Sequence, residues 1–204
     1  MTLANRITLT RLFLSLAVFF LVIQKTFLTV LVGLIVMIVA SVSDAIDGMI
    51  ARRTRTTTSF GAIADPFADK ILVMSAFIAF ASVKILDIPL WAIFLILLRE
   101  LTISTLRVLA ALQGSVMKAE AAGKFKTTIQ LIAGFTIMAL LLNKVWIAEN
   151  PGTYPPLLAI DAWAGPLSWW LTVAAAAVTV VSGVIYLVNH SDLIRRSWSE
   201  KKNV

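Results

Sequence analysis

Long apolar runs alternate with short polar stretches along this chain. Each run is long enough for a helix to cross the hydrocarbon core of a bilayer, which takes roughly 17–25 residues. Charged residues interrupt two of the runs, so a strict window for uncharged spans would find fewer helices. The pattern predicts an all-α integral membrane protein, a six-transmembrane-helix bundle with helices at about 7–23, 28–51, 61–85, 89–112, 123–142 and 167–188.

The distribution of basic residues supports six helices. If the loops alternate between two sides, twelve basic residues fall on one side and three on the other. By the positive-inside rule, both termini and the loop between the second and third helices face the cytoplasm, so the bundle is expected to have a cytoplasm-facing polar cavity. The sparse side has only Lys25, Lys84 and Lys144, and the proline-containing stretch Asn150–Pro156 is predicted as an extracytoplasmic loop.

Composition agrees with a membrane protein. The 204 residues are 59% hydrophobic and 14% charged, and no linker divides them, so residues 1–204 are expected to form a single domain. The net charge is +7, and the basic residues flank apolar segments. This placement indicates attraction to anionic lipid or phosphate and no nucleic acid partner. The absence of cysteine excludes disulfides, and His190 alone does not suggest a zinc site.

Three helices have distinctive sequence features. Pro66 is expected to bend or loosen the start of the third helix. In the fourth helix Glu100, Ser104 and Arg107 share one face, so their charges can pair and point inward. The last helix is the most uniformly apolar and is interpreted as lipid-facing scaffold, with His190 at its interfacial end.

Four aspartates lie in otherwise apolar surroundings. Asp44 and Asp47 close the second helix and Asp65 and Asp69 open the third, and each spacing puts both carboxylates on one helix face. An uncompensated charge at membrane depth costs at least ~2.5 kcal/mol. Four oxygen donors suit a divalent cation such as magnesium or manganese, which would supply that compensation. The alternative is simple pairing with the arginines that follow, Arg52, Arg53 and Arg55.

A polar stripe marks the start of the first helix, where Asn5, Thr8, Arg11 and Ser15 recur at helical spacing. The stripe either closes one wall of the polar site or simply lies among lipid headgroups.

The aspartate segment resembles the signature of the CDP-alcohol phosphatidyltransferases, which are integral membrane enzymes of phospholipid synthesis. The pattern is D-x-x-D-G-x-x-A-R-x8-G-x3-D-x3-D, and every fixed position matches: Asp44, Asp47, Gly48, Ala51, Arg52, Gly61, Asp65 and Asp69. The Asn-x-x-Thr-x-x-Arg pattern at the start of the chain also occurs in members of that family.

The resemblance implies a reaction and a cofactor. A hydroxyl attacks the β-phosphorus of a CDP-linked lipid and CMP leaves, with help from Mg²⁺ or Mn²⁺, expected as two ions. Carried over to this sequence, Asp44, Asp47, Asp65 and Asp69 are metal ligands and Asp69 is also the catalytic base. The residues expected to bind the CDP-lipid are Asn5, Thr8, Asp47, Gly48, Arg52, Thr58 and Gly61. A homodimer in the bacterial cytoplasmic membrane is implied as well.

The acceptor is suggested by a second group of residues. Arg99, Glu100, Ser104 and Arg107, followed by 123–127, resemble the phosphatidylglycerophosphate synthase branch. That branch uses CDP-diacylglycerol and glycerol 3-phosphate, whose dianionic phosphate would be received by Arg107, Lys124 and Lys126.

Several alternatives remain open at this stage. The lysines can be topology signals alone, and the acceptor can be that of a cardiolipin, inositol-phosphate or serine transferase. A divalent-cation transporter would also use membrane aspartates, but it needs a continuous polar pathway that the outer half of this chain lacks. A lipid-binding scaffold would not need the carboxylate register.

Overall fold

The computed structural model describes residues 3–54, 59–112, 121–152 and 154–191, and their side chains within 9–43, 70–110, 123–152 and 154–191. These residues form six α-helices and one short 3-10 helix, with no β-strand among them. The elements are α1 (Leu3–Ile23), α2 (Phe27–Thr54), α3 (Ser59–Ala81), η1 (Lys84–Leu86), α4 (Leu90–Leu112), α5 (Ala121–Glu149) and α6 (Pro155–Asn189). The all-α prediction is confirmed.

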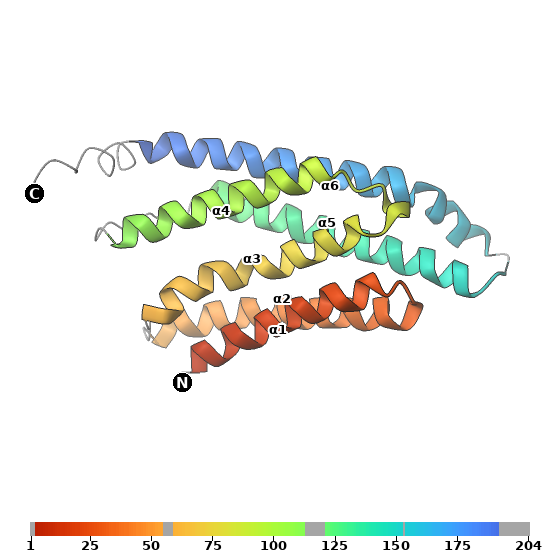
Figure 1. Cartoon of the computed structure of the whole chain (residues 1–204), viewed down its shortest axis with the longest axis horizontal. Coiled ribbons are helices and arrows are strands. Elements are labelled where there is room, and N and C mark those ends of the chain that lie inside the picture. Colours follow the sequence, from red (N-terminus) through yellow and green to blue (C-terminus); the bar gives the residue numbers. More distant parts are fainter. Residues whose placement is uncertain (1–2, 55–58, 113–120, 153, 192–204) are drawn as a thin grey trace, which may run out of the picture.

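The helices run side by side along the long axis of the molecule (Figure 1). α1 packs on α2 and α3, and α6 packs on α4 and α5. Contacts of α2 with α5, and of α3 with both α4 and α5, join the two groups. The start of α1, the end of α2, the start of α3 and the end of α6 lie at the same end of the bundle (Figure 1). The predicted aspartate segments and both ends of the described chain therefore share one end.

Apolar side chains both fill the interior and cover the outside. The largest fully buried side chains include Phe77, Phe80, Met37, Ile137 and Leu141. Large apolar side chains are also widely exposed, among them Phe13, Phe94, Trp163, Trp170 and Val188. Such an apolar exterior suits contact with lipid. Two segments, Gly123–Glu149 and Pro155–Asn189, are long and apolar enough to cross a membrane, which supports membrane association.

The third helix ends earlier than predicted. α3 stops at Ala81, because the backbone N–H groups of Ser82 and Val83 donate to carbonyls three residues back, at 3.1 and 2.9 Å. Bonds of this type tighten and terminate a helix. The left-handed Asp87, with φ of 49°, then turns the chain into α4. α3 continues through Pro66 without a break.

The last two helices are longer than predicted. α5 continues to Glu149, and α6 begins at Pro155, so the two final residues assigned to the loop are helical. A proline in the first turn costs no hydrogen bond, since those N–H groups have no partner within the helix. Lys144 Nζ donates to Asp161 Oδ2 at 2.8 Å across the pair, which accommodates both charges. α6 bends in its first half (Figure 1), where Pro166 lies inside the helix.

The interpretation of the last helix as mere lipid-facing scaffold is wrong for one of its faces. α6 buries a row of small and polar side chains against α4 and α5, namely Ser168, Thr172, Thr179, Ser182 and Tyr186. Its outward face is apolar, as predicted, with Val181, Val184 and Val188 exposed.

Candidate functional site

A pocket of about 400 Å³ with both apolar and charged lining residues opens between α3, α4, α5 and α6. Its charged lining residues are Lys70 from α3, Arg99, Glu100 and Arg107 from α4, and Lys124 and Lys126 from α5. Among the described lining residues, five are basic and one, Glu100, is acidic. The pocket, called the basic pocket below, therefore carries an excess of positive charge and suits an anionic ligand.

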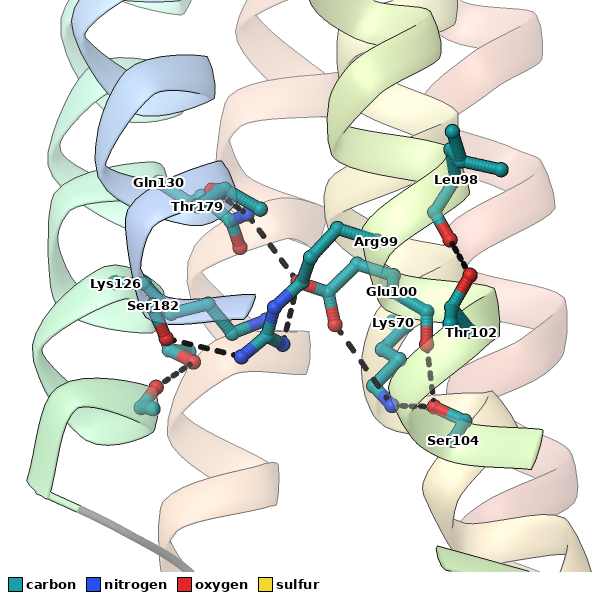
Figure 2. A network of polar contacts seen from close by, with 12 residues as sticks. Lys70, Leu98, Arg99, Glu100, Thr102, Ser104, Lys126, Gln130, Thr179 and Ser182 are labelled. Atoms are coloured by element: carbon teal, nitrogen blue, oxygen red, sulfur yellow. Dashed lines mark hydrogen bonds and ion pairs between the residues drawn. The ribbon is translucent and has the colours of Figure 1, made fainter. Parts of the chain in front are cut away.

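Glu100 is the centre of the charges around this pocket. Its side chain is only 3% exposed. It forms an ion pair with Lys126. Its Oε1 lies 3.5 Å from Arg99 Nη1, and its Oε2 lies 3.7 Å from Lys70 Nζ (Figure 2). A buried carboxylate is tolerated when cations and hydrogen bonds compensate its charge. The Glu100 carboxylate in turn reduces the repulsion among these three cations.

Hydrogen bonds extend this cluster to α6. Arg99 Nη2 donates to Ser182 Oγ at 2.9 Å, and Gln130 Nε2 donates to Thr179 Oγ1 at 2.8 Å (Figure 2). Ser104 accepts a hydrogen bond from Lys70 and donates to the Glu100 carbonyl oxygen at 2.6 Å. Side chains from four helices are thus tied together at the basic pocket, which fixes the positions of its cations.

Aromatic contacts position Arg107. Its guanidinium carbon lies 5.7 Å from the centroid of the Tyr186 ring, within the range of a cation–π interaction. Tyr186 also stacks on His190, with ring centroids 4.4 Å apart. His190 Nδ1 lies 3.0 Å from the Tyr186 carbonyl oxygen, so the end of α6 is held locally.

The three residues predicted to receive the acceptor phosphate, Arg107, Lys124 and Lys126, all line the basic pocket. Their environments differ. Lys124 is exposed, Arg107 is half-buried, and Lys126 is 5% exposed and engaged by Glu100. The predicted shared face of Glu100, Ser104 and Arg107 is confirmed, since the first two are buried and Arg107 faces the same pocket as Glu100.

The other predicted site residues have side chains outside the described part of the chain: Asn5, Thr8, Asp44, Asp47, Gly48, Arg52, Thr58, Gly61, Asp65 and Asp69. Their backbone placement is informative for the aspartates. Asp44 and Asp47 belong to α2 and Asp65 and Asp69 to α3, in helix segments at the same end of the bundle. Four hard oxygen donors fit a divalent cation. Lys70, which lines the basic pocket, directly follows Asp69.

The predicted stripe on the first helix has two described members. Arg11 and Ser15 are both buried, and Ser15 Oγ donates to the Arg11 carbonyl oxygen at 2.8 Å. Neither residue lines the basic pocket. Whether the stripe closes a wall around the aspartates stays a prediction.

Sequence reasoning missed Lys70, Gln130, Thr179, Ser182 and Tyr186 as members of the site. The signal was present on α6, where Thr172, Thr179, Ser182 and Tyr186 recur at spacings of seven, three and four residues. These spacings define one helix face. Because alanine and valine fill most positions between these residues, the helix reads as uniformly apolar.

Gly183 lets Arg99 reach α6. A Cβ atom at this position would lie 2.7 Å from Arg99 Cγ and 3.3 Å from its Nε. Because the clash involves the stem of the side chain, the whole arginine would have to move. We expect Gly183→Ala to break the hydrogen bond from Arg99 to Ser182 and lower the melting temperature of the purified protein.

Gly123→Ala is the matched control for this prediction. Gly123 lines the same pocket, but a Cβ atom there would meet nothing within 4 Å. Alanine also favours helix over glycine by about 0.5–1 kcal/mol, so the melting temperature should hold or rise. Equal melting temperatures for the two variants would contradict the assigned role of Gly183.

Comparison with known proteins adds independent information. The family model for CDP-alcohol phosphatidyltransferase matches residues 1–181. A CDP-diacylglycerol–glycerol-3-phosphate 3-phosphatidyltransferase of Bacillus subtilis is 34% identical over 167 residues, which cover 82% of this chain and 77% of that protein. The enzyme of the same description from Rickettsia bellii is 33% identical over 156 residues, covering 76% and 77%. A CMP-forming cardiolipin synthase of Streptomyces coelicolor is 28% identical over 164 residues, covering 80% and 69%.

Proposed function

This chain belongs to the CDP-alcohol phosphatidyltransferase family, and on that premise we propose that it transfers the phosphatidyl group of CDP-diacylglycerol to glycerol 3-phosphate. The products are phosphatidylglycerophosphate and CMP. The observation that carries the choice of acceptor is the basic pocket, which has five basic residues and one carboxylate among its described lining residues. Relatives described as using glycerol 3-phosphate support the same choice.

The proposed reaction divides the work between two neighbouring parts of the bundle. The acceptor hydroxyl forms a bond to the β-phosphorus while the bond from that phosphorus to the CMP oxygen breaks. Asp69 accepts the hydroxyl proton, since a positioned carboxylate can act as a general base. Arg107, Lys124 and Lys126 bind the acceptor phosphate in the basic pocket, which Lys70 connects to the aspartate segment.

The aspartates would hold divalent cations, Mg²⁺ or Mn²⁺, with two ions as the preferred number. Support comes from the oxygen donor set and from the shared end of the α2 and α3 segments. When bound, the ions would screen the charge of the CDP-lipid pyrophosphate. The residues proposed to hold the CDP-lipid beside them are Asn5, Thr8, Asp47, Gly48, Arg52, Thr58 and Gly61.

Release of CMP by the purified protein tests the function. The assay presents CDP-diacylglycerol with glycerol 3-phosphate, serine, inositol phosphate, phosphatidylglycerol or glycerol as acceptor. We expect efficient CMP release with glycerol 3-phosphate. Equal use of serine or phosphatidylglycerol would overturn the acceptor assignment, and absence of CMP release with every acceptor would overturn the transferase.

Arg107→Ala is expected to raise the KM for glycerol 3-phosphate roughly ten- to hundredfold, because a hydrogen bond to a charged group contributes about 1.5–3 kcal/mol. The KM for CDP-diacylglycerol should change little. Lys84→Ala is the control, since Lys84 is exposed in η1 and does not line the basic pocket. An unchanged acceptor KM in Arg107→Ala would remove this residue from the acceptor site.

We propose that the chain crosses the bacterial cytoplasmic membrane six times, with both termini and the basic pocket on the cytoplasmic side. It would form one domain and work as a homodimer. Labelling of single cysteines tests the orientation cleanly, since the chain has no native cysteine. Ser59→Cys should react only after the membrane is permeabilised, and Lys84→Cys should react in intact cells. The reverse pattern would overturn the orientation.

A further inference from the structure

Four buried side-chain polar atoms at the basic pocket have no hydrogen-bond partner among the described residues. Three of them can donate, namely the Tyr186 hydroxyl, Arg107 Nε and Arg99 Nε, and the fourth is the acceptor Glu100 Oε2, which lies 3.7 Å from Lys70 Nζ. All of these residues line the pocket, and Tyr186 is only 3% exposed. A buried donor without a partner is destabilising, so a group of them at one pocket wall indicates that a ligand completes their hydrogen bonds.

We propose that Tyr186 is an acceptor-binding residue of this enzyme, whose hydroxyl donates a hydrogen bond to the acceptor phosphate while its ring holds Arg107 for the same group. The proposal rests on the proposed function. It adds a neutral residue of α6 to a phosphate site otherwise made by cations of α4 and α5.

The chemistry of the neighbours selects an anion as the ligand. Both arginine Nε atoms can only donate, and the nearby lysines can only donate as well. Glu100, the only carboxylate among the described lining residues, already faces Lys126, Arg99 and Lys70. A ligand that partners the three donors accepts several hydrogen bonds at once, and the surrounding positive charge favours an anion, as a phosphate monoester is.

The position of Tyr186 links the hydroxyl to Arg107. Its ring lies 5.7 Å from the Arg107 guanidinium carbon and stacks on His190, so the ring orientation is fixed from its own helix and from α4. A phenylalanine would keep these ring contacts and lose only the hydroxyl. A leucine would lose both, which makes the two contributions separable.

The experiment compares Tyr186→Phe, Tyr186→Leu and wild type as full-length protein in detergent. KM is measured for glycerol 3-phosphate and for CDP-diacylglycerol, and the melting temperature is measured without ligand. Tyr186→Phe should raise the acceptor KM roughly tenfold and leave the KM for CDP-diacylglycerol unchanged. Tyr186→Leu should raise the acceptor KM further, because Arg107 is then no longer held. Val184→Ala, on the exposed face of α6, is the control.

Other outcomes overturn the inference. A lower melting temperature in Tyr186→Phe with an unchanged acceptor KM would show that the hydroxyl has a structural role only. Equal increases in both KM values would show a general disturbance of the site. If wild type fails to release CMP with glycerol 3-phosphate, the proposed function falls and the inference with it. If wild type is active and Tyr186→Phe has the same KM for glycerol 3-phosphate, the inference is overturned and the proposed function stands.

Discussion

Replacing Asp65 by asparagine is expected to lower turnover at least ~100-fold, since even residues that only orient metal ligands contribute about 10–100-fold. The same result is expected for Asp44→Asn and Asp47→Asn. Asparagine keeps the side-chain volume and removes the charge, so the helices should persist and the melting temperature should change little. CMP release, measured against magnesium concentration, checks the prediction.

Asp87→Asn is the matched control for these variants. Asp87 is exposed, lies outside both aspartate segments and has a positive φ that asparagine adopts readily. Its turnover should equal that of wild type. Near-normal turnover of Asp44→Asn or Asp65→Asn would contradict a shared metal site.

Asp69→Asn separates the roles of ligand and base. High magnesium should partly restore a variant that has lost only a ligand, because added metal compensates for weaker binding. It should not restore a variant that has lost the proton acceptor. Full recovery of Asp69→Asn at high magnesium would therefore make Asp69 a ligand alone.

The apolar pattern predicted the helix count well and several helix ends poorly. Runs of apolar residues identify helices because each must bury or present apolar surface along its length. Lys144 and Asp161 lie in the segments of the last two helices that the pattern left out. The structure pairs them across α5 and α6, and pairing between distant residues is not visible in a local pattern.

The basic residues of the candidate site could be predicted from the sequence, but the residues that contact them could not. Arg107, Lys124 and Lys126 stand out as charges in or beside apolar helices. That they line one pocket, and that Glu100 engages Lys126, depends on how α6 packs against both α4 and α5. Tyr186 and the hydroxyl residues of α6 share one helix face by their spacing, but only the packing shows that this face lies beside the charged residues of α4 and α5.

The ion pair between Glu100 and Lys126 carries the second large prediction. Removing one partner of a buried pair costs about 3–5 kcal/mol, because the other charge stays buried with less compensation. Glu100→Gln leaves three cations around a neutral amide, and Lys126→Met leaves Glu100 to Arg99 and Lys70 at 3.5 and 3.7 Å. Each single variant should therefore melt well below wild type, and the double variant should lose less than the sum of the two losses.

The same three variants decide what Lys126 does for the acceptor. If Lys126 only neutralises Glu100, the double variant should recover both the melting temperature and the KM for glycerol 3-phosphate. If Lys126 also contacts the phosphate, as proposed, stability should recover while the acceptor KM stays high. Lys144→Met and Asp161→Asn form the control pair, because their ion pair is partly exposed and lies away from the basic pocket. The coupling free energy between Lys144 and Asp161 should be below about 1 kcal/mol, and the KM for glycerol 3-phosphate should not change in these variants.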